Sequence, residues 1–491
     1  MKMTALSVTQ LSRALCQKEV SAHEVTLAYL EQTETKDPAI AAYLTVCAEQ
    51  ALQQAREIDR ARAQGEDLPP LAGIPMAVKD NICTRGIRTT CASRMLRDFV
   101  PPYNAAVIER LYSAKAILLG KTNLDEFAMG SSTEHSAFFP TCNPLDPART
   151  PGGSSGGSGA AVAAQCAPFA LGSDAGGSIR QPAAFCGVVG MRPTYGAVSR
   201  YGLISFAPSL DQIGPMTRTV RDNALVLRAV LGHDPRDARS LAVSHADPSA
   251  QIGQPLRGLR IALLSSVGGC KPCPAVRQVL EHAVAVLTDL GCVIEETELP
   301  SLQYALPAYH VIADAEASSN LARFDGVRYG HRSAQSDSLA DLYRNSRSEG
   351  FGDEVKRRIL LGTFVLRAEH YDAYYRQATR VRRRITQDLL AVLADRDAIL
   401  SAVTPDMPPR IGEKTADVLA MYQSDIFTVP ASLAGLPALS LPGGYAEDGM
   451  PAGIQLIGRE LHEGLLYRIG AAYEDAVSDM YRDKRSSDHA Q

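Results

Sequence analysis

The sequence predicts an α/β protein in which helices pack on a β-sheet and a helical layer comes first. Over roughly the first 65 residues, apolar side chains recur at i, i+3 and i+4, the spacing of amphipathic helices. After that, short apolar runs alternate with amphipathic segments, as strands and helices that cover one another do. The 491 residues are 45% hydrophobic and 21% charged, which is enough apolar material for a large core. Because no strong linker divides the chain, we expect one domain over residues 1–491.

The N-terminal half is predicted to begin with helices and continue with strands. The helical segments are 5–15, 24–33 and 48–64. The apolar runs LAGIPMAVKDNI and AILLGKTN predict strands within 71–82 and 116–123, with a helix at 104–114 between them.

In the C-terminal half, strands and helices are again predicted to alternate. This follows a helix at 220–232 and a polar, Pro-containing segment at 232–258. The expected elements are strands at 259–266 and 291–300 flanking a helix at 275–291, a long amphipathic helical region at 354–394, and a strand at 452–458 before a last helix.

Composition excludes several classes of protein. A formal net charge of −4 gives no nucleic-acid footprint, so any RNA would be held mainly by another subunit. The N-terminus lacks the apolar core of a signal peptide and no stretch could span a bilayer, which predicts a cytoplasmic protein. Ten scattered cysteines suit reduced thiols, and the single C-x-x-C, Cys270 to Cys273, is a weak metal or redox signal.

The stretch TPGGSSGGSGAA, residues 150–161, has the composition of either a flexible linker or an active-site loop. It runs into an apolar chain of small residues, which favours a buried loop. Its GSSGG matches the nucleophile elbow of α/β-hydrolases, with Ser155 as nucleophile, but such a short motif arises easily by chance. The GKT at 120–122 lacks the earlier glycine of a P-loop, since Lys115 stands there, and no lysine has a serine three residues before it.

Three residues remain as candidates for chemistry: Lys79, Ser154 and Ser178. Taken singly, Lys79 is more often a strand-end residue with its charge in water, and each serine an ordinary turn residue. The chain prefers arginine to lysine, however, and only lysine can give up its proton when it is desolvated. Gly176 and Gly177 before Ser178 allow successive N–H groups to point at one spot, as in an oxyanion hole.

Together these segments resemble the amidase signature family. The motifs are GIPMAVKDN, the run 120–164 that contains the Gly/Ser loop, FALGSDAGGSIRQPAAFCGVVGMRPT and SLDQIGPMTRTVRD. The match is unbroken over roughly residues 70 to 222, far more specific than a short motif. It implies a single large mixed β-sheet covered by helices on both faces. Residues 1–66 would form the helical N-terminal layer, 67–222 the signature core, and 223–491 the C-terminal part of the same sheet.

The resemblance implies a Ser-cisSer-Lys triad. Ser178 would be the acylated nucleophile, Ser154, after a cis peptide bond, would relay its proton, and Lys79 would be the neutral base. Backbone N–H groups from Ala175, Gly176, Gly177 and Ser178 would receive the oxyanion. Only one of ten histidines, His135, lies in the matched block, without a partner acid in register, so a Ser-His-Asp design has no clear candidate.

Within the family, NLDEFAMGSSTEHS, GFGDEVKRRILLGTFVL and YQSDIFTVPASLAGLPALSLP are similar to the A subunits of bacterial tRNA-dependent amidotransferases. That similarity implies glutamine as substrate, with Arg358 on its α-carboxylate, Asp425 on its α-ammonium and Tyr309 closing over it. Without it, Arg358 and Asp425 would be taken for a surface arginine and a loop acid. Two residues depart from the family pattern: Ala175 replaces a common threonine, and Asp406 a small or hydroxyl residue.

The same similarity implies partners. A B subunit would use ATP and Mg²⁺ to activate Glu-tRNA(Gln) or Asp-tRNA(Asn), receive ammonia through a tunnel and hold most of the tRNA, and a C subunit would join the two in a heterotrimer. No cofactor or metal is expected on this chain, and no membrane. Two alternatives stay open: a free-standing amidase that hydrolyses small amides, and a non-enzymatic subunit whose glycine loops only pack the core.

Overall fold

The computed structural model describes residues 2–415 and 417–487. Its α-helices are α1 (Val8–Cys16), α2 (Ala22–Ile40), α3 (Ala48–Ala63), α4 (Ala106–Ser113), α5 (Gly156–Ala163), α6 (Arg180–Cys186), α7 (Val220–Val230), α8 (Pro274–Asp289), α9 (Ala305–Leu321), α10 (Leu339–Gly350), α11 (Asp353–Val365), α12 (Ala368–Tyr371), α13 (Gln377–Asp395), α14 (Val418–Gln423), α15 (Val429–Ala434) and α16 (Glu463–Ser487). The strands are β1 (Tyr43–Val46), β2 (Pro75–Lys79), β3 (Ile117–Thr122), β4 (Phe169–Asp174), β5 (Val189–Arg192), β6 (Gln212–Thr217), β7 (Arg260–Leu264), β8 (Val293–Glu296), β9 (Ala398–Ala402), β10 (Ala438–Tyr445) and β11 (Pro451–Ile457).

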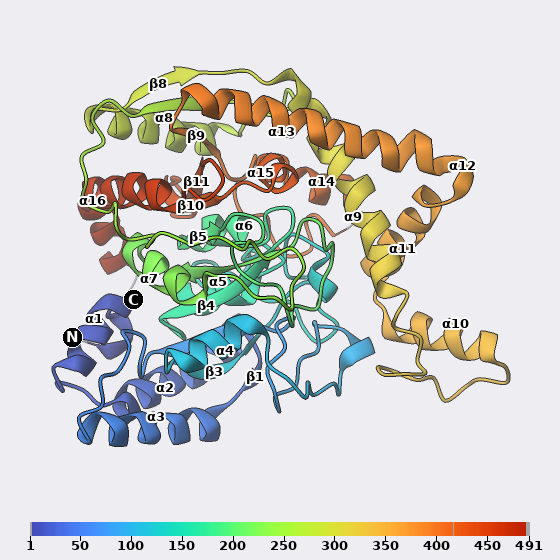
Figure 1. Ribbon diagram of the computed structural model, residues 1–491, viewed down its shortest axis with the longest axis horizontal. Helices are drawn as coiled ribbons and strands as arrows, with labels where there is room; N and C mark the ends of the chain where they lie inside the picture. Colours follow the sequence, from blue (N-terminus) through green and yellow to red (C-terminus); the bar gives the residue numbers. More distant parts are fainter. Residues whose placement is uncertain (1, 416, 488–491) are drawn as a thin grey trace.

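These strands form one mixed sheet of 11 strands in the order β1-β3-β2-β4-β6-β5-β10-β11-β9-β7-β8. The pairs β2 with β3, β2 with β4, β7 with β8 and β7 with β9 are parallel, and the other neighbours are antiparallel. In Figure 1 the N-terminal helices lie at one end of the molecule and β8 with α13 at the other. The large mixed sheet predicted from the resemblance is confirmed.

Strand β10 shows that helices cover both faces of the sheet. Its Ser440 donates a hydrogen bond to the backbone carbonyl of Arg180 in α6. The adjacent side chains, Leu439 and Leu441, lie against Gly470 of α16. Since successive side chains of a strand point to opposite faces, α6 and α16 lie on opposite sides. The expected two-sided covering is therefore present.

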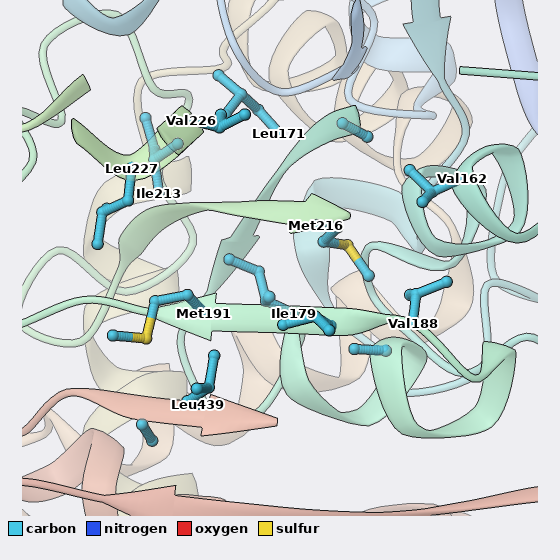
Figure 2. Close-up of a cluster of buried hydrophobic side chains, with 14 of the residues drawn as sticks. Val162, Leu171, Ile179, Val188, Met191, Ile213, Met216, Val226, Leu227 and Leu439 are labelled. Atoms are coloured by element: carbon cyan, nitrogen blue, oxygen red, sulfur yellow. The ribbon is translucent and has the colours of Figure 1, made fainter. Parts of the chain in front are cut away.

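The centre of the sheet is held by a buried apolar cluster contributed by helices from both sides. Figure 2 shows Ile213 of β6 beside Leu227 of α7. Met216 of the same strand packs on α5, where a Cβ placed on Gly159 would lie 3.2 Å from its methyl group. The side chains of Ile213, Leu227 and Met216 are fully buried. Ile213 and Met216 are three residues apart and so face opposite sides of β6. This packing fixes α5 and the loop before it against the central strands.

Two expectations about the elements need correction. The N-terminal layer is not wholly helical, because β1 lies inside residues 1–66 and pairs antiparallel with β3 at the edge of the sheet. A strand of four residues is too short for its periodicity to be recognised. The region 354–394 is also broken into α11, α12, a π-helical turn (Asp372–Arg376) and α13, because Arg367 is extended, with φ −64° and ψ 145°.

Candidate active site

The three predicted catalytic residues come from segments that meet at one edge of the sheet. Lys79 is the last residue of β2, and Ser178 lies in the turn after β4. Because β2 and β4 are parallel neighbours, their carboxyl ends lie side by side. Ser154 reaches the same edge from the loop before α5, and its Oγ lies 2.8 Å from Nζ of Lys79. The structure thus brings Lys79 and Ser154 into direct contact.

The side chain of Lys79 is completely buried. Burial lowers the pKa of Lys79 from 10.5 to about 7, although the carboxylates of Asp125 and Asp174 oppose the change. Desolvation has this effect because it penalises the ammonium more than the neutral amine. A substantial fraction of Lys79 is therefore neutral near pH 7 and can accept a proton.

The loop that carries Ser154 is fixed by buried polar groups. The peptide bond between Gly153 and Ser154 is cis. The N–H of Gly153 donates to Oε1 of Gln181 at 2.9 Å, and the hydroxyl of Thr133 donates to the neighbouring carbonyl of Gly152 at 2.8 Å. These bonds hold the Ser154 hydroxyl against the Lys79 amine.

The turn before Ser178 leaves its backbone N–H groups free. Within the described residues, no protein atom accepts a hydrogen bond from the N–H of Gly176, Gly177 or Ser178. The hydroxyl of Thr428 donates to the Gly176 carbonyl at 2.5 Å and so fixes the orientation of that peptide. Gly177 has φ +142°, and a Cβ there would lie 2.3 Å from Oγ1 of Thr428. Ala175, which begins the turn, is buried. Free, preoriented N–H groups of this kind can stabilise an oxyanion.

Ser178 differs from the other two residues in its accessibility. Its exposed fraction is 9%, against 0% for both Lys79 and Ser154. The backbone links the two serine segments, because the N–H of Ser155 donates to the Ser178 carbonyl at 3.1 Å. No hydrogen bond joins the Ser178 and Ser154 hydroxyls in the described part of the chain. Catalytic hydrogen bonds commonly tighten only when substrate is present.

A buried ion network supports the turn on its far side. Arg180 binds Asp174 with two nitrogens, at 3.0 and 3.1 Å, and donates to the Thr428 carbonyl at 2.8 Å. Arg192 lies 3.2 Å from the same carboxylate. Although burial opposes ionisation, the two guanidinium groups hold the pKa of Asp174 well below its usual range. Two cations around one carboxylate keep both ends of the turn in place.

Arg358 of α11 is buried but keeps free donors. Its Nε donates to Glu354 at 2.7 Å, and its guanidinium lies 5.0 Å from the Tyr422 ring centre and 5.4 Å from that of Phe206. Its two terminal nitrogens have no hydrogen-bond partner among the described residues. Burial opposes its charge, but Asp314 and Glu354 raise the pKa of Arg358. A permanent cation with a free pair of N–H donors matches a carboxylate.

Tyr309 and Asp425 both lie close enough to Arg358 to feel its charge. A Cβ placed on Gly176 would lie 2.5 Å from the Tyr309 hydroxyl, so this ring covers the turn. Burial raises the pKa of Tyr309, Asp425 adds to the rise and Arg358 opposes it. Burial also raises the pKa of Asp425 to about 8, against the opposing effect of Arg358. The structure therefore gathers the three predicted substrate residues around the same turn.

A cleft of about 520 Å³ opens beside this group. Its lining includes Glu126, His135, Arg357, Met421 and Glu354, the partner of Arg358. The triad residues do not line it. The cleft reaches Glu354, the partner of Arg358, while Lys79 stays enclosed.

Residues 24–467 match the protein-family model described as Amidase. The chain belongs to the amidase family. It is 54% identical over 477 residues to the A subunit of glutamyl-tRNA(Gln) amidotransferase from Moorella thermoacetica, covering 97% of this chain and 98% of that protein. The crystal structure of the A subunit from Thermotoga maritima aligns with a TM-score of 0.80 at 41% identity, over 97% of this chain and 95% of that chain. Peptide amidase from Stenotrophomonas maltophilia aligns with a TM-score of 0.79 at 31% identity, over 96% of each chain.

The weaker motifs of this amidase have structural explanations. Lys121 of the GKT sequence is buried in β3, 3.2 Å from the Asp80 carboxylate, so it is not placed to bind phosphate. Cys270 and Cys273 are free thiols. Burial raises the pKa of Cys270, and Asp406, one of the two departures from the family pattern, adds to the rise. Cys270 therefore lacks the activated thiolate of a redox motif.

No group of three or more histidine, cysteine, aspartate or glutamate residues is placed to hold a metal ion within 2–415 and 417–487. In the same ranges, no helix combines the length and the apolar character needed to cross a membrane.

Sequence reasoning missed several residues of the site. Asp174 and Arg180 flank the double glycine in SDAGGSIR, and their opposite charges six residues apart were the available signal. Glu354 lies one helical turn before Arg358, a spacing that predicts the observed ion pair. Thr428 and Tyr422 lie in the segment 422–442 that carries the resemblance, but their contacts with the site arise only in the tertiary fold.

Proposed function

We propose that this amidase is the glutaminase subunit of a tRNA-dependent amidotransferase. It hydrolyses glutamine through a Ser178 acyl-enzyme and supplies ammonia for the conversion of Glu-tRNA(Gln) to Gln-tRNA(Gln). The observation that carries the proposal is the buried Lys79 amine, with a pKa near 7 and in hydrogen-bond contact with Ser154. The relatives that are named as A subunits of glutamyl-tRNA(Gln) amidotransferase support the assignment.

In the proposed mechanism, Ser178 Oγ attacks the side-chain amide carbon of glutamine. The Ser178 proton passes to Ser154, whose own proton passes to Lys79. The N–H groups of Gly176, Gly177 and Ser178 bind the oxyanion. Lys79 returns the proton through Ser154 to the leaving nitrogen, ammonia departs, and water then releases glutamate from the acyl-enzyme.

Glutamine brings a carboxylate and an ammonium group that must both be paired on burial. The free terminal nitrogens of Arg358 would bind the α-carboxylate. Asp425 would bind the α-ammonium, whose charge would return the raised pKa of Asp425 towards its ordinary range. Tyr309 would cover the ligand from the side of Gly176.

The partner subunits are part of the same proposal. A B subunit would bind ATP, Mg²⁺ and most of the Glu-tRNA(Gln), and a C subunit would join it to this chain in a cytoplasmic heterotrimer. The formal net charge of −4 supports placing the tRNA on the partner.

The test replaces Arg358 with alanine in the assembled complex and supplies either glutamine or ammonium chloride. Charge-assisted hydrogen bonds are worth about 1.5–3 kcal/mol each, so glutamine-dependent amidation should fall roughly ten- to hundredfold. Ammonium-dependent amidation should stay near wild type, because it bypasses the glutamine site. Arg357→Ala is the matched control: Arg357 also pairs with Glu354 but is 42% exposed, and both reactions should continue.

Equal loss with both nitrogen donors would assign Arg358 to structure or to contact between subunits and contradict the proposal. Retention with both would remove it from the glutamine site. Efficient hydrolysis of unrelated small amides, with no association with B and C subunits, would instead favour a free-standing amidase.

A further inference from the structure

The Lys79 amine has three oxygen neighbours, although the proposed proton relay uses only one. Nζ lies 2.8 Å from Oγ of Ser154, 2.8 Å from Oγ of Ser155 and 3.3 Å from the carbonyl oxygen of Ser173. The second neighbour, Ser155, is the residue that the GSSGG motif nominated as a nucleophile. Its contacts indicate a different role.

The hydrogen of the Ser155 hydroxyl is already committed. Oγ of Ser155 donates to the Ser173 carbonyl at 3.0 Å and accepts from the Ser173 N–H at 3.3 Å. A hydroxyl has one hydrogen to donate, so Ser155 can meet Lys79 only as an acceptor. The Ser173 carbonyl can likewise only accept.

A neutral amine has two N–H donors and one lone pair. With Ser155 and the Ser173 carbonyl accepting the two N–H groups, the lone pair of Lys79 is left for the third neighbour, Ser154. The hydroxyl of Ser154 must then donate to Lys79, and its own lone pairs become available to the proton of Ser178.

We infer that Ser155 is a positioning residue that turns the lone pair of Lys79 towards Ser154 and so sets the direction of the proton relay. This inference rests on the proposed triad and deepens it. During acylation the Ser178 O–H bond breaks and its proton bonds to Ser154. The Ser154 O–H bond breaks in turn and its proton bonds to Lys79, which becomes an ammonium. When the leaving group departs, the Lys79 ammonium gives its proton back to Ser154 and the Ser154 proton passes to the leaving nitrogen, while Ser178 stays acylated.

The surroundings of Ser155 agree with a fixed orientation and not with nucleophilic attack. Its side chain is 0% exposed. It packs so closely on β4 that a Cβ at Gly172 would lie 3.0 Å from its Oγ. A carbonyl substrate has no approach to an oxygen held in this way.

The experiment measures how fast phenylmethylsulfonyl fluoride modifies the full-length chain at a series of pH values, with the modified residue located by mass spectrometry. In this reaction the serine oxygen bonds to sulfur, fluoride leaves and the serine proton goes to the base. The rate therefore reports activation of Ser178 without glutamine, tRNA or partner subunits.

Ser155→Ala is compared with Ser158→Ala. Ser158 is also a buried serine of the same segment that donates to a β4 carbonyl, that of Leu171 at 3.0 Å, and it has no hydrogen bond to Lys79. We expect Ser155→Ala to slow modification of Ser178 at least tenfold, since general-base catalysis contributes roughly 10²–10⁴-fold. The fall of the modification rate on the acidic side should move to lower pH. Removing an acceptor destabilises the ammonium form of Lys79 more than the neutral amine and so lowers the pKa of Lys79. Ser158→Ala should keep the wild-type modification rate and the wild-type dependence of that rate on pH.

A double-mutant cycle separates positioning from packing. In a Ser154→Ala background, adding Ser155→Ala should change the rate less than twofold, because its effect acts through Ser154. If Ser155→Ala does not fold, Ser155→Cys fills the same space with a weak acceptor. It should show the same loss of modification rate and the same shift of the acidic fall to lower pH.

Four results would each overturn the inference. Ser155→Ala could keep the wild-type modification rate and pH dependence, or its loss of rate could add to that of Ser154→Ala in the double mutant. Ser158→Ala could lose as much rate as Ser155→Ala, or Ser155 itself could be the modified residue. Failure of the triad looks different. Wild-type protein that is not modified at Ser178 would contradict the proposed nucleophile, whatever Ser155 does.

Discussion

Replacing Lys79 with methionine should change how the stability of the protein depends on pH. In the folded chain, burial lowers the pKa of Lys79 to about 7, and in the unfolded chain it returns to its ordinary value near 10.5. Between these two values the unfolded state binds one more proton than the folded state. The free energy of unfolding of the wild type therefore rises with pH through this window, and Lys79→Met lacks this contribution.

The size of the effect follows from the two pKa values. A difference of roughly 3.5 units corresponds to about 5 kcal/mol, at about 1.4 kcal/mol per unit. From pH 7 to pH 10, the free energy of unfolding of the wild type should rise by about 3–4 kcal/mol relative to that of Lys79→Met. The absolute offset also contains the lost hydrogen bonds to Ser154, Ser155 and the Ser173 carbonyl. The pH dependence of the difference does not.

The assay is urea unfolding of both proteins at several pH values, with refolding checked at each. Groups common to the two proteins cancel in the difference. Lys121→Met is the control for removal of a buried lysine: it leaves the Asp80 carboxylate unpaired and should lower stability throughout the range. Parallel stability curves for wild type and Lys79→Met would refute the buried, neutral amine, and with it the base proposed for catalysis.

The other predictions concern catalysis by the assembled enzyme. Lys79→Arg should be as inactive as Lys79→Ala in a glutaminase assay, because a guanidinium keeps its charge and cannot accept the proton; substantial activity would make Lys79 an electrostatic residue. Ser178→Ala should form no acyl-enzyme detectable by mass spectrometry, whereas Ser154→Ala should keep some activity if water replaces the relay; an acyl group on Ser154 would reverse the assignment. Gly177→Ala should lower kcat at least a hundredfold and lower the melting temperature as well, because φ +142° strains an alanine and its Cβ would meet Thr428 and displace the oxyanion N–H groups; wild-type kcat would contradict that geometry.

Much of the architecture could be predicted because its signals are local. Helical periodicity located α7 and α8 within a few residues, and apolar runs located β2, β3 and β11. Strand β1 was missed because four residues at a sheet edge carry too little pattern. The break at Arg367 was missed because nothing in the local sequence there forbids a continuous helix.

For the site, the sequence by itself determined the chemical inventory: a lysine after an apolar run, a Gly/Ser loop and a serine after two glycines. Those residues could be named because the motifs are contiguous. Which of Ser154 and Ser155 faces which neighbour could not be read from them, because both lie in one GGSSGG run.

Only the tertiary structure decided how these groups work. The pKa of Lys79 depends on burial beneath segments 75 to 94 residues away, and the free nitrogens of Arg358 depend on Glu354 occupying only its Nε. Hydrogen-bond direction at Ser155 is likewise set by the Ser173 backbone of a neighbouring strand. Desolvation and donor–acceptor geometry depend on what surrounds a group in space, and residues distant in the chain supply those surroundings.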